Sequence, residues 1–141
     1  MEKGSVVEMS SSSGYHGNVI KKRIVIVEDH EEMQILYKAM FRREKRIEIA
    51  AQVQDAEDAL NAIKESDPDL VIVDITLPGM SGIELVEQVH ESFPGIKFLV
   101  VSGHDSDRFY ESAKKAGADD FIMKGESTEL LSAVRRLLGI T

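Results

Sequence analysis

Short apolar runs that alternate with stretches of helical periodicity constrain the fold of this chain most. The predicted strands cover residues 23–28, 47–53, 69–74, 97–102 and 118–124, and the predicted helices cover 30–43, 55–65, 83–93, 106–116 and 128–138. The first, third and fourth runs are apolar almost throughout, which is typical of strands that are covered on both faces. Because parallel strands need right-handed crossovers, the pattern predicts an α/β fold with a doubly wound parallel sheet.

The spacing of apolar residues in two of the predicted helices indicates which side chains face the sheet. Met33, Leu36, Tyr37 and Met40 recur at helical spacing in the first helix. Asp55 precedes the second helix and is a candidate N-cap, since its carboxylate can accept from the backbone N–H three residues later. Both patterns predict helices with one apolar and one polar face.

Four of the predicted strands end at polar side chains. Glu28 and Asp29 follow the first strand, Asp74 closes the third, Ser102 the fourth and Lys124 the fifth. In an open parallel sheet, ligands bind outside the carboxyl ends of the strands. Acids at a helix start can also be simple caps, but the side chains at the other strand ends favour a site. Three acids, a hydroxyl and an ammonium at one edge suit a divalent cation such as Mg²⁺ together with a phosphoryl group.

The residue types at this edge suggest particular chemistry. Asp74 can be a metal ligand, a base, or a nucleophile that forms an acyl phosphate. Lys124 is a counter-charge for the acids, and Ser102 offers a hydroxyl donor. His30 and His104 lie beside these residues in the sequence, and each is a candidate metal ligand. A loop or cap role is favoured for both, because a hard Mg²⁺ site has little use for imidazole.

Composition excludes several classes of function. The 141 residues contain no cysteine, so disulfides, zinc thiolates and thiol nucleophiles are excluded. The net charge of −8 disfavours binding to nucleic acid or to an anionic membrane. Residues 1–21 include a serine run and no apolar signal segment, which predicts a flexible tail and a cytoplasmic protein. Residues 22–141 are predicted to form one domain.

Four sequence blocks, in order and spacing, resemble the receiver domain of two-component response regulators. The resemblance extends from Lys22 to Gly139 and is closest to receivers that precede a helix-turn-helix module. It rests on the following blocks: Val27-Glu28-Asp29-His30, the run from Val73 to Gly82, Ser102, and Gly117-Ala118 leading to Lys124.

The resemblance implies a fold and a metal-dependent reaction. The fold would be flavodoxin-like, with strand order 2-1-3-4-5 and five helices. Asp74 would accept a phosphoryl group. Asp29, Asp74 and the carbonyl of Thr76 would bind Mg²⁺ directly, and Glu28 would bind it through water. Lys124 would pair with the phosphoryl oxygens.

The resemblance also implies a switch and its partners. Ser102 would move toward the phosphate and Phe121 would change rotamer with it. The donor would be a sensor histidine kinase or a phosphotransfer protein, and the target a downstream effector or output domain. Apart from self-catalysed phosphoryl transfer and slow autodephosphorylation, the chain would not be an enzyme. Independently of the resemblance, the net charge of −8 predicts that the chain does not bind nucleic acid or membrane directly.

A mixed-sign surface on the last two helices and the last strand could support a phosphorylation-dependent homodimer. Its charged residues are Lys114, Lys115, Asp119, Asp120, Arg135 and Arg136.

Two residues depart from the family pattern. Gly125 follows Lys124 where many receivers have proline, so the usual cis peptide bond cannot form there. Phe121 lacks the hydroxyl of a tyrosine. The end at Thr141 is consistent with a stand-alone receiver or with part of a longer regulator.

Three alternatives remain open. A phosphatase of the haloacid dehalogenase type also uses an aspartyl nucleophile and Mg²⁺, but its motif follows the first strand. A flavodoxin-like cofactor binder would need a small polar phosphate loop after that strand, where this chain has acids. A degenerate receiver would act only as an interaction module.

Overall fold

The computed structural model describes residues 20–77, 80–103, 107–125 and 127–140, so the predicted tail at 1–21 lies almost wholly outside the described residues. Strands and helices alternate along the chain. In order they are β1 (Lys22–Val27), α1 (Glu31–Arg42), β2 (Ile47–Val53), α2 (Ala56–Ser66), β3 (Leu70–Asp74), α3 (Gly82–Ser92), β4 (Lys97–Ser102), α4 (Asp107–Ala116), β5 (Asp120–Met123) and α5 (Ser127–Leu138).

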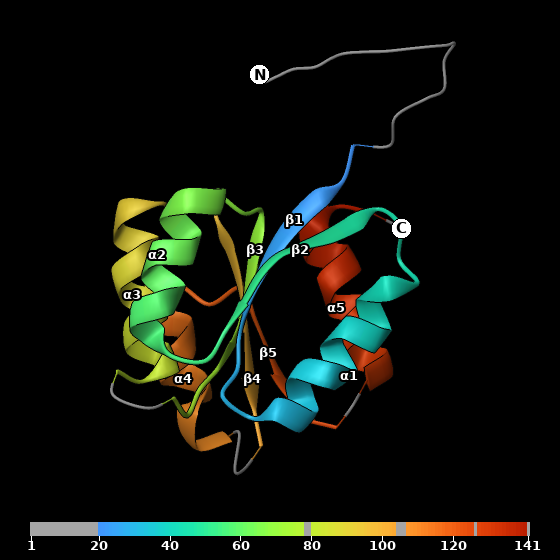
Figure 1. The fold of residues 1–141 in the computed structure, drawn as a ribbon. Coiled ribbons are helices and arrows are strands. Elements are labelled where there is room, and N and C mark those ends of the chain that lie inside the picture. Colours follow the sequence, from blue (N-terminus) through green and yellow to red (C-terminus); the bar gives the residue numbers. More distant parts are fainter. Residues whose placement is uncertain (1–19, 78–79, 104–106, 126, 141) are drawn as a thin grey trace, which may run out of the picture.

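The strands form one parallel sheet in the order β2-β1-β3-β4-β5. Helices α2, α3 and α4 cover one face, and α1 and α5 cover the other (Figure 1). The predicted doubly wound fold and the strand order are therefore confirmed. The order reverses direction between β1 and β3, and in such sheets the ligand crevice lies outside the carboxyl ends of those two strands.

Each strand contributes to two separate cores, because successive side chains point to opposite faces of the sheet. Val25, Val27 and Val71 pack under α2, α3 and α4, whereas Ile24 and Ile26 pack under α1 and α5. This double covering explains why β1 and β3 lack a polar–apolar alternation. It also leaves only the strand ends available for polar side chains.

The helix boundaries agree closely with the predicted ones. The burial of one side chain and the start of one helix differ from the prediction. Asp55 caps α2 as expected, accepting from the N–H of Asp58 at 2.8 Å. In α1, however, Phe41 is buried and Leu36 is 37% exposed, so the expected position of Leu36 in the core is wrong. Helix α3 starts one residue earlier than predicted, at Gly82.

Basic residues gather at the amino edge of the sheet, where β1 and β2 begin and α1 ends. Some are neutralised by neighbouring acids: Arg23 lies 3.4 Å from Glu48, and Arg46 lies 2.8 Å from Glu44. The acids at the strand ends lie at the opposite edge. The basic cluster contains eight of the 17 lysines and arginines, namely Lys21, Lys22, Arg23, Lys38, Arg42, Arg43, Lys45 and Arg46.

Candidate functional site

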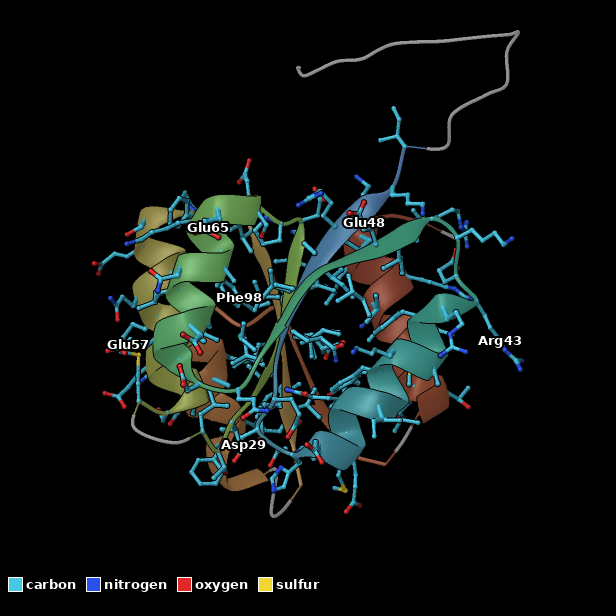
Figure 2. The ribbon with its side chains drawn as sticks, in the orientation of Figure 1. Asp29, Arg43, Glu48, Glu57, Glu65 and Phe98 are labelled. Carbon is cyan, nitrogen blue, oxygen red and sulfur yellow. The ribbon has the colours of Figure 1, made fainter. Side chains whose placement is uncertain are left out.

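The carboxyl edge of the sheet brings two acids and a lysine from three different strands into direct contact. Lys124 Nζ lies 2.9 Å from Asp74 Oδ2 and 3.1 Å from Glu28 Oε2. Glu28 is 1% exposed and Asp74 is 2% exposed. Asp29 lies beside them at the end of β1, at the lower edge of the sheet in Figure 2. The structure thus collects the four charged residues that the strand pattern placed at one edge.

The pKa values at this edge follow from burial and from the contacts. Burial raises the pKa of Glu28, and the nearby charge of Asp74 raises it further, against the hydrogen bonds from His30 and Lys124. Burial acts to lower the pKa of Lys124, but its hydrogen bonds to Asp74 and Glu28 outweigh this effect and raise that pKa overall. Lys124 therefore remains a cation and is the natural counter-ion of the two buried acids.

The imidazole of His30 is turned into the acid cluster. His30 occupies the N-cap position of α1, but its side chain makes no capping hydrogen bond. Its Nδ1 lies 2.8 Å from Glu28 Oε2, 3.2 Å from Asp29 Oδ1 and 3.8 Å from Asp74 Oδ2. His30 is thus the loop and cap residue that was expected, although its side chain does not do the capping. His104, the other histidine singled out from the sequence, lies outside the described residues.

The charges around His30 change its proton affinity. The hydrogen bond with Glu28 raises the pKa of His30, the charge of Lys124 opposes this, and the charge of Asp29 adds to it. The ring is nevertheless 61% exposed, so it lies at the solvent side of the cluster while its Nδ1 stays in contact with the buried Glu28.

The donor set is suited to a divalent cation. Glu28, Asp29, His30 and Asp74 each offer one ligand atom, and these atoms all lie within 4.8 Å of one another. Among the described residues, Glu28 Oε1 and Asp29 Oδ1 are buried oxygens that accept no hydrogen bond. Unpaired buried oxygens are costly, and a hard cation that takes oxygen ligands would satisfy them.

Backbone groups hold Asp74 in place. The N–H of Thr76 donates to Asp74 Oδ1 at 3.0 Å, so both carboxylate oxygens of Asp74 have partners. A Cβ built on Gly82 would lie 2.2 Å from the carbonyl oxygen of Asp74, so only glycine fits there. The sequence pattern placed Gly82 in a loop and gave it no role. The one signal for it was a glycine directly before a helical pattern.

The remaining predicted residues lie around this centre. Ser102 is 1% exposed at the end of β4, and its carbonyl accepts from the N–H of Lys124 at 2.7 Å. Gly125 has φ +93°, a conformation that proline cannot adopt, so this turn is built differently from one with a cis proline. Phe121 is half-buried and packs edge-to-face on Tyr110, with ring centroids 6.1 Å apart.

Comparison with known proteins is consistent with this geometry. The sequence model described as the response regulator receiver domain matches residues 24–135. The transcriptional regulatory protein DegU of Brevibacillus brevis is 29% identical over 119 residues, which cover 84% of this chain and 50% of DegU. The chemotaxis protein CheY of Thermotoga maritima is 34% identical over 103 residues, which cover 73% of this chain and 85% of CheY.

Solved structures show the same fold. A LuxR-family two-component response regulator from Aurantimonas superposes with a TM-score of 0.80 at 29% identity, covering 84% of this chain and 86% of that one. A CheY-like receiver domain protein from Methanospirillum hungatei gives 0.76 at 32% identity, covering 84% and 94%.

Two further observations concern the length of the chain and of its helices. It spans about half the length of the regulators DegU and VraR that it matches. None of the helices in the described residues is long and apolar enough to cross a membrane.

Proposed function

Since the chain belongs to the response regulator receiver domain family, we propose that Asp74 accepts a phosphoryl group in a Mg²⁺-dependent reaction. The observation that carries this proposal is the contact of Lys124 with both buried acids, at 2.9 Å from Asp74 and 3.1 Å from Glu28. A buried carboxylate that faces an ammonium at an open strand edge is placed to receive a phosphoryl group. The same ammonium then neutralises the oxygens that arrive with it.

The residues have distinct roles in the proposed transfer. One carboxylate oxygen of Asp74 forms a bond to phosphorus while the bond from phosphorus to the donor nitrogen breaks, and that nitrogen keeps the electron pair. Lys124 pairs with a phosphoryl oxygen, and Ser102 donates its hydroxyl to another. Holding Asp74 between Lys124 and the N–H of Thr76 costs no reorganisation at the moment of transfer.

Mg²⁺ would be held by Asp29, Asp74 and the carbonyl of Thr76, with Glu28 acting through water. When bound, it supplies positive charge that neutralises the acids and the phosphoryl oxygens. Two buried oxygens that accept no hydrogen bond, Glu28 Oε1 and Asp29 Oδ1, support the assignment. Autodephosphorylation, in which water hydrolyses the phosphorylated Asp74, would be the only reaction that the chain catalyses besides its own phosphorylation.

The proposed partners follow from the family. The donor is a sensor histidine kinase or a phosphotransfer protein, and the target is a downstream effector or an output domain. Since the related regulators are about twice as long, an output domain in the same polypeptide is one form of that target.

A phosphorylation-dependent homodimer stays a prediction. Much of the mixed-sign surface is already paired within the chain. Arg136 contacts Asp120, Arg135 lies 3.2 Å from Glu44, and Asp119 accepts from the N–H of Phe98 at 2.8 Å. A dimer through this surface would have to exchange these contacts for contacts with a second copy.

The haloacid dehalogenase alternative finds no support in the comparisons, and Asp74 lies at the end of β3 rather than β1. A flavodoxin-like cofactor site is disfavoured by the acids that follow β1. A degenerate receiver differs from the proposal only in its failure to be phosphorylated.

The test is modification of the full chain by acetyl phosphate, followed by intact mass. We expect a mass increase of one phosphoryl group with Mg²⁺, none with a chelator, and none in Asp74→Asn. Asp58→Asn is the matched control, since Asp58 is exposed on α2. Labelling that survives in Asp74→Asn, or that ignores the chelator, contradicts the proposal.

A further inference from the structure

The imidazole of His30 lies at the position that a cation shared by the three acids would take. Its Nδ1 is 2.8, 3.2 and 3.8 Å from oxygens of Glu28, Asp29 and Asp74, and 3.3 Å from Lys124 Nζ. The imidazole nitrogen and the ammonium therefore together occupy the space between the acids. A divalent ion that enters this space must either displace the ring or bind to it.

We propose that His30 Nδ1 is a nitrogen ligand of the divalent ion, so that it raises the affinity of this site for late first-row transition ions more than its affinity for Mg²⁺. The inference rests on the proposed function, because it concerns the same cation site. Carboxylate and water ligands suit Mg²⁺, whereas an added imidazole suits Co²⁺, Ni²⁺ and Zn²⁺.

The local structure directs the side chain of His30 at the acids and not at the helix start. Its side chain caps nothing, although it stands at the N-cap of α1. Its backbone N–H donates to Glu28 Oε2 at 3.1 Å, which fixes the carboxylate and the ring on the same short segment. The second oxygen of that carboxylate, Oε1, is buried and accepts no hydrogen bond. A metal ion would give Oε1 a partner, and it would replace the contact between Nδ1 and Oε2.

Exposure of the ring explains why Mg²⁺ binding should not depend on it. With 61% of the side chain exposed, the ring can turn to solvent when the ion prefers oxygen ligands alone. The contribution of His30 should therefore grow along the series Mg²⁺, Mn²⁺, Co²⁺, Ni²⁺, following the increasing preference of these ions for nitrogen.

The experiment measures dissociation constants of the full chain for these four ions by calorimetry. The chain has four histidines, so the starting protein carries His16→Ala, His90→Ala and His104→Ala, and His30→Ala is added to it. We expect His30→Ala to leave Mg²⁺ affinity within about twofold. It should weaken Ni²⁺ binding by at least about tenfold, since loss of even an outer partner of a metal ligand costs roughly 10–100-fold.

A spectroscopic readout separates ligation from an indirect effect. Bound Cu²⁺, an ion that favours imidazole, should show spin-echo modulation from an imidazole nitrogen, and this signal should vanish in His30→Ala. Equal losses for all four ions, or no nitrogen signal, would overturn the role of His30. His90→Ala alone is the matched control and should change neither readout, because His90 lies near the end of α3 and is not one of the four residues grouped at the cation site.

The two proposals fail in different ways. Suppose Asp29→Ala abolishes binding of every ion and Asp74 is phosphorylated, but His30→Ala leaves the ratios of the affinities unchanged. Then the inference about His30 is wrong and the receiver chemistry stands. If no ion binds and Asp74 is never modified, both are wrong.

Discussion

At the scale of single residues, Lys124 controls the charge balance of the site. Glu28 and Asp74 are buried carboxylates that would repel one another without a cation between them. The side chain of Lys124 is itself only 16% exposed, so its ammonium is held close to both acids. Lys124 and a divalent ion are therefore alternative sources of the same positive charge.

We expect Lys124→Met to lower the free energy of unfolding without Mg²⁺ by about 3 kcal/mol, because it leaves buried charge uncompensated. Mg²⁺ should then stabilise the variant more than the unchanged protein, since the ion replaces the ammonium. Urea denaturation with and without Mg²⁺ measures both effects. Lys64→Met, at an exposed position of α2, is the control. Equal stabilities of the variant and the unchanged protein would show that Lys124 is not the counter-ion.

A second residue-scale prediction concerns Gly82. A Cβ at this position would lie 2.2 Å from the carbonyl oxygen of Asp74, so Gly82→Ala must push α3 away from β3. Overpacking of this kind costs about 1–3 kcal/mol, and the shift should also slow phosphorylation of Asp74. Thermal melting and the acetyl phosphate assay report on the two effects. Gly95→Ala meets nothing within 4 Å and should be silent in both.

Some of the site could be predicted from residue order and some could not. Glu28, Asp74 and Lys124 were predictable because each closes an apolar run, and parallel strands end at one edge. The direction of the His30 ring could not be predicted, because it depends on carboxylates that follow β1 and close β3 and not on the local pattern. The close approach of Gly82 to Asp74 likewise depends on how α3 packs against β3.

At the scale of elements, the starts of α1 and α3 differ in their side-chain caps. Ser81 accepts from the N–H of Glu84 at 3.1 Å, and Glu84 Oε1 accepts from the N–H of Ser81 at 3.1 Å, which completes a capping box. Helix α1 has no side-chain cap, because His30 faces the acids. The capping box therefore stabilises the start of α3, where Gly82 lies against Asp74, whereas the start of α1 has no side-chain cap.

Removing the cap of α3 should therefore have a stability cost and a functional one. We expect Ser81→Ala to lower the free energy of unfolding by about 1 kcal/mol. It should also reduce the rate of phosphorylation, because Gly82 is the next residue and contacts Asp74. Ser92→Ala, at the other end of α3, is the matched control. A loss of stability with an unchanged rate would separate the cap from the site.

The boundaries of the elements were largely predictable, and the inner face of α1 was not. Four apolar residues at helical spacing included Leu36, yet the buried residues of α1 are Tyr37 and Phe41. Leu36 instead contributes to the lining of a hollow beside His30 and Lys124. An amphipathic pattern defines a stripe, but the rotation of the helix about its axis is set by packing against the sheet.

At the scale of the whole molecule, Glu44 ties distant parts of the chain together. It follows α1, lies 2.8 Å from Arg46 before β2 and 3.2 Å from Arg135 on α5. The hydrogen bonds from Arg46 and Arg135 lower the pKa of Glu44 to about 2. A carboxylate with a lowered pKa stabilises the folded state above its unfolded value of 4.5, and this contribution is lost as the pH falls toward 2.

We expect Glu44→Gln to be less stable than the unchanged protein at neutral pH. The difference should shrink as the pH is lowered from 4.5 to 2, because Glu44 becomes protonated over that interval. Urea unfolding at several pH values measures the difference, with Glu57→Gln on the exposed side of α2 as the control. A difference that stayed constant down to pH 2 would mean that the charge of Glu44 contributes nothing.

The separation of charge along the strands also gives the molecule an electric dipole. Bases surround the amino edge of the sheet, while Glu28, Asp29, Glu31, Glu32 and Asp74 surround the carboxyl edge. In the field of a charged partner, such a molecule experiences a torque as well as an attraction, and it turns its acidic edge toward a cationic surface before contact. The phosphoryl group proposed for Asp74 would add up to about two negative charges at the acidic end of this dipole. Phosphorylated and unmodified molecules should therefore differ in how they align during approach, at distances where no side chains yet touch.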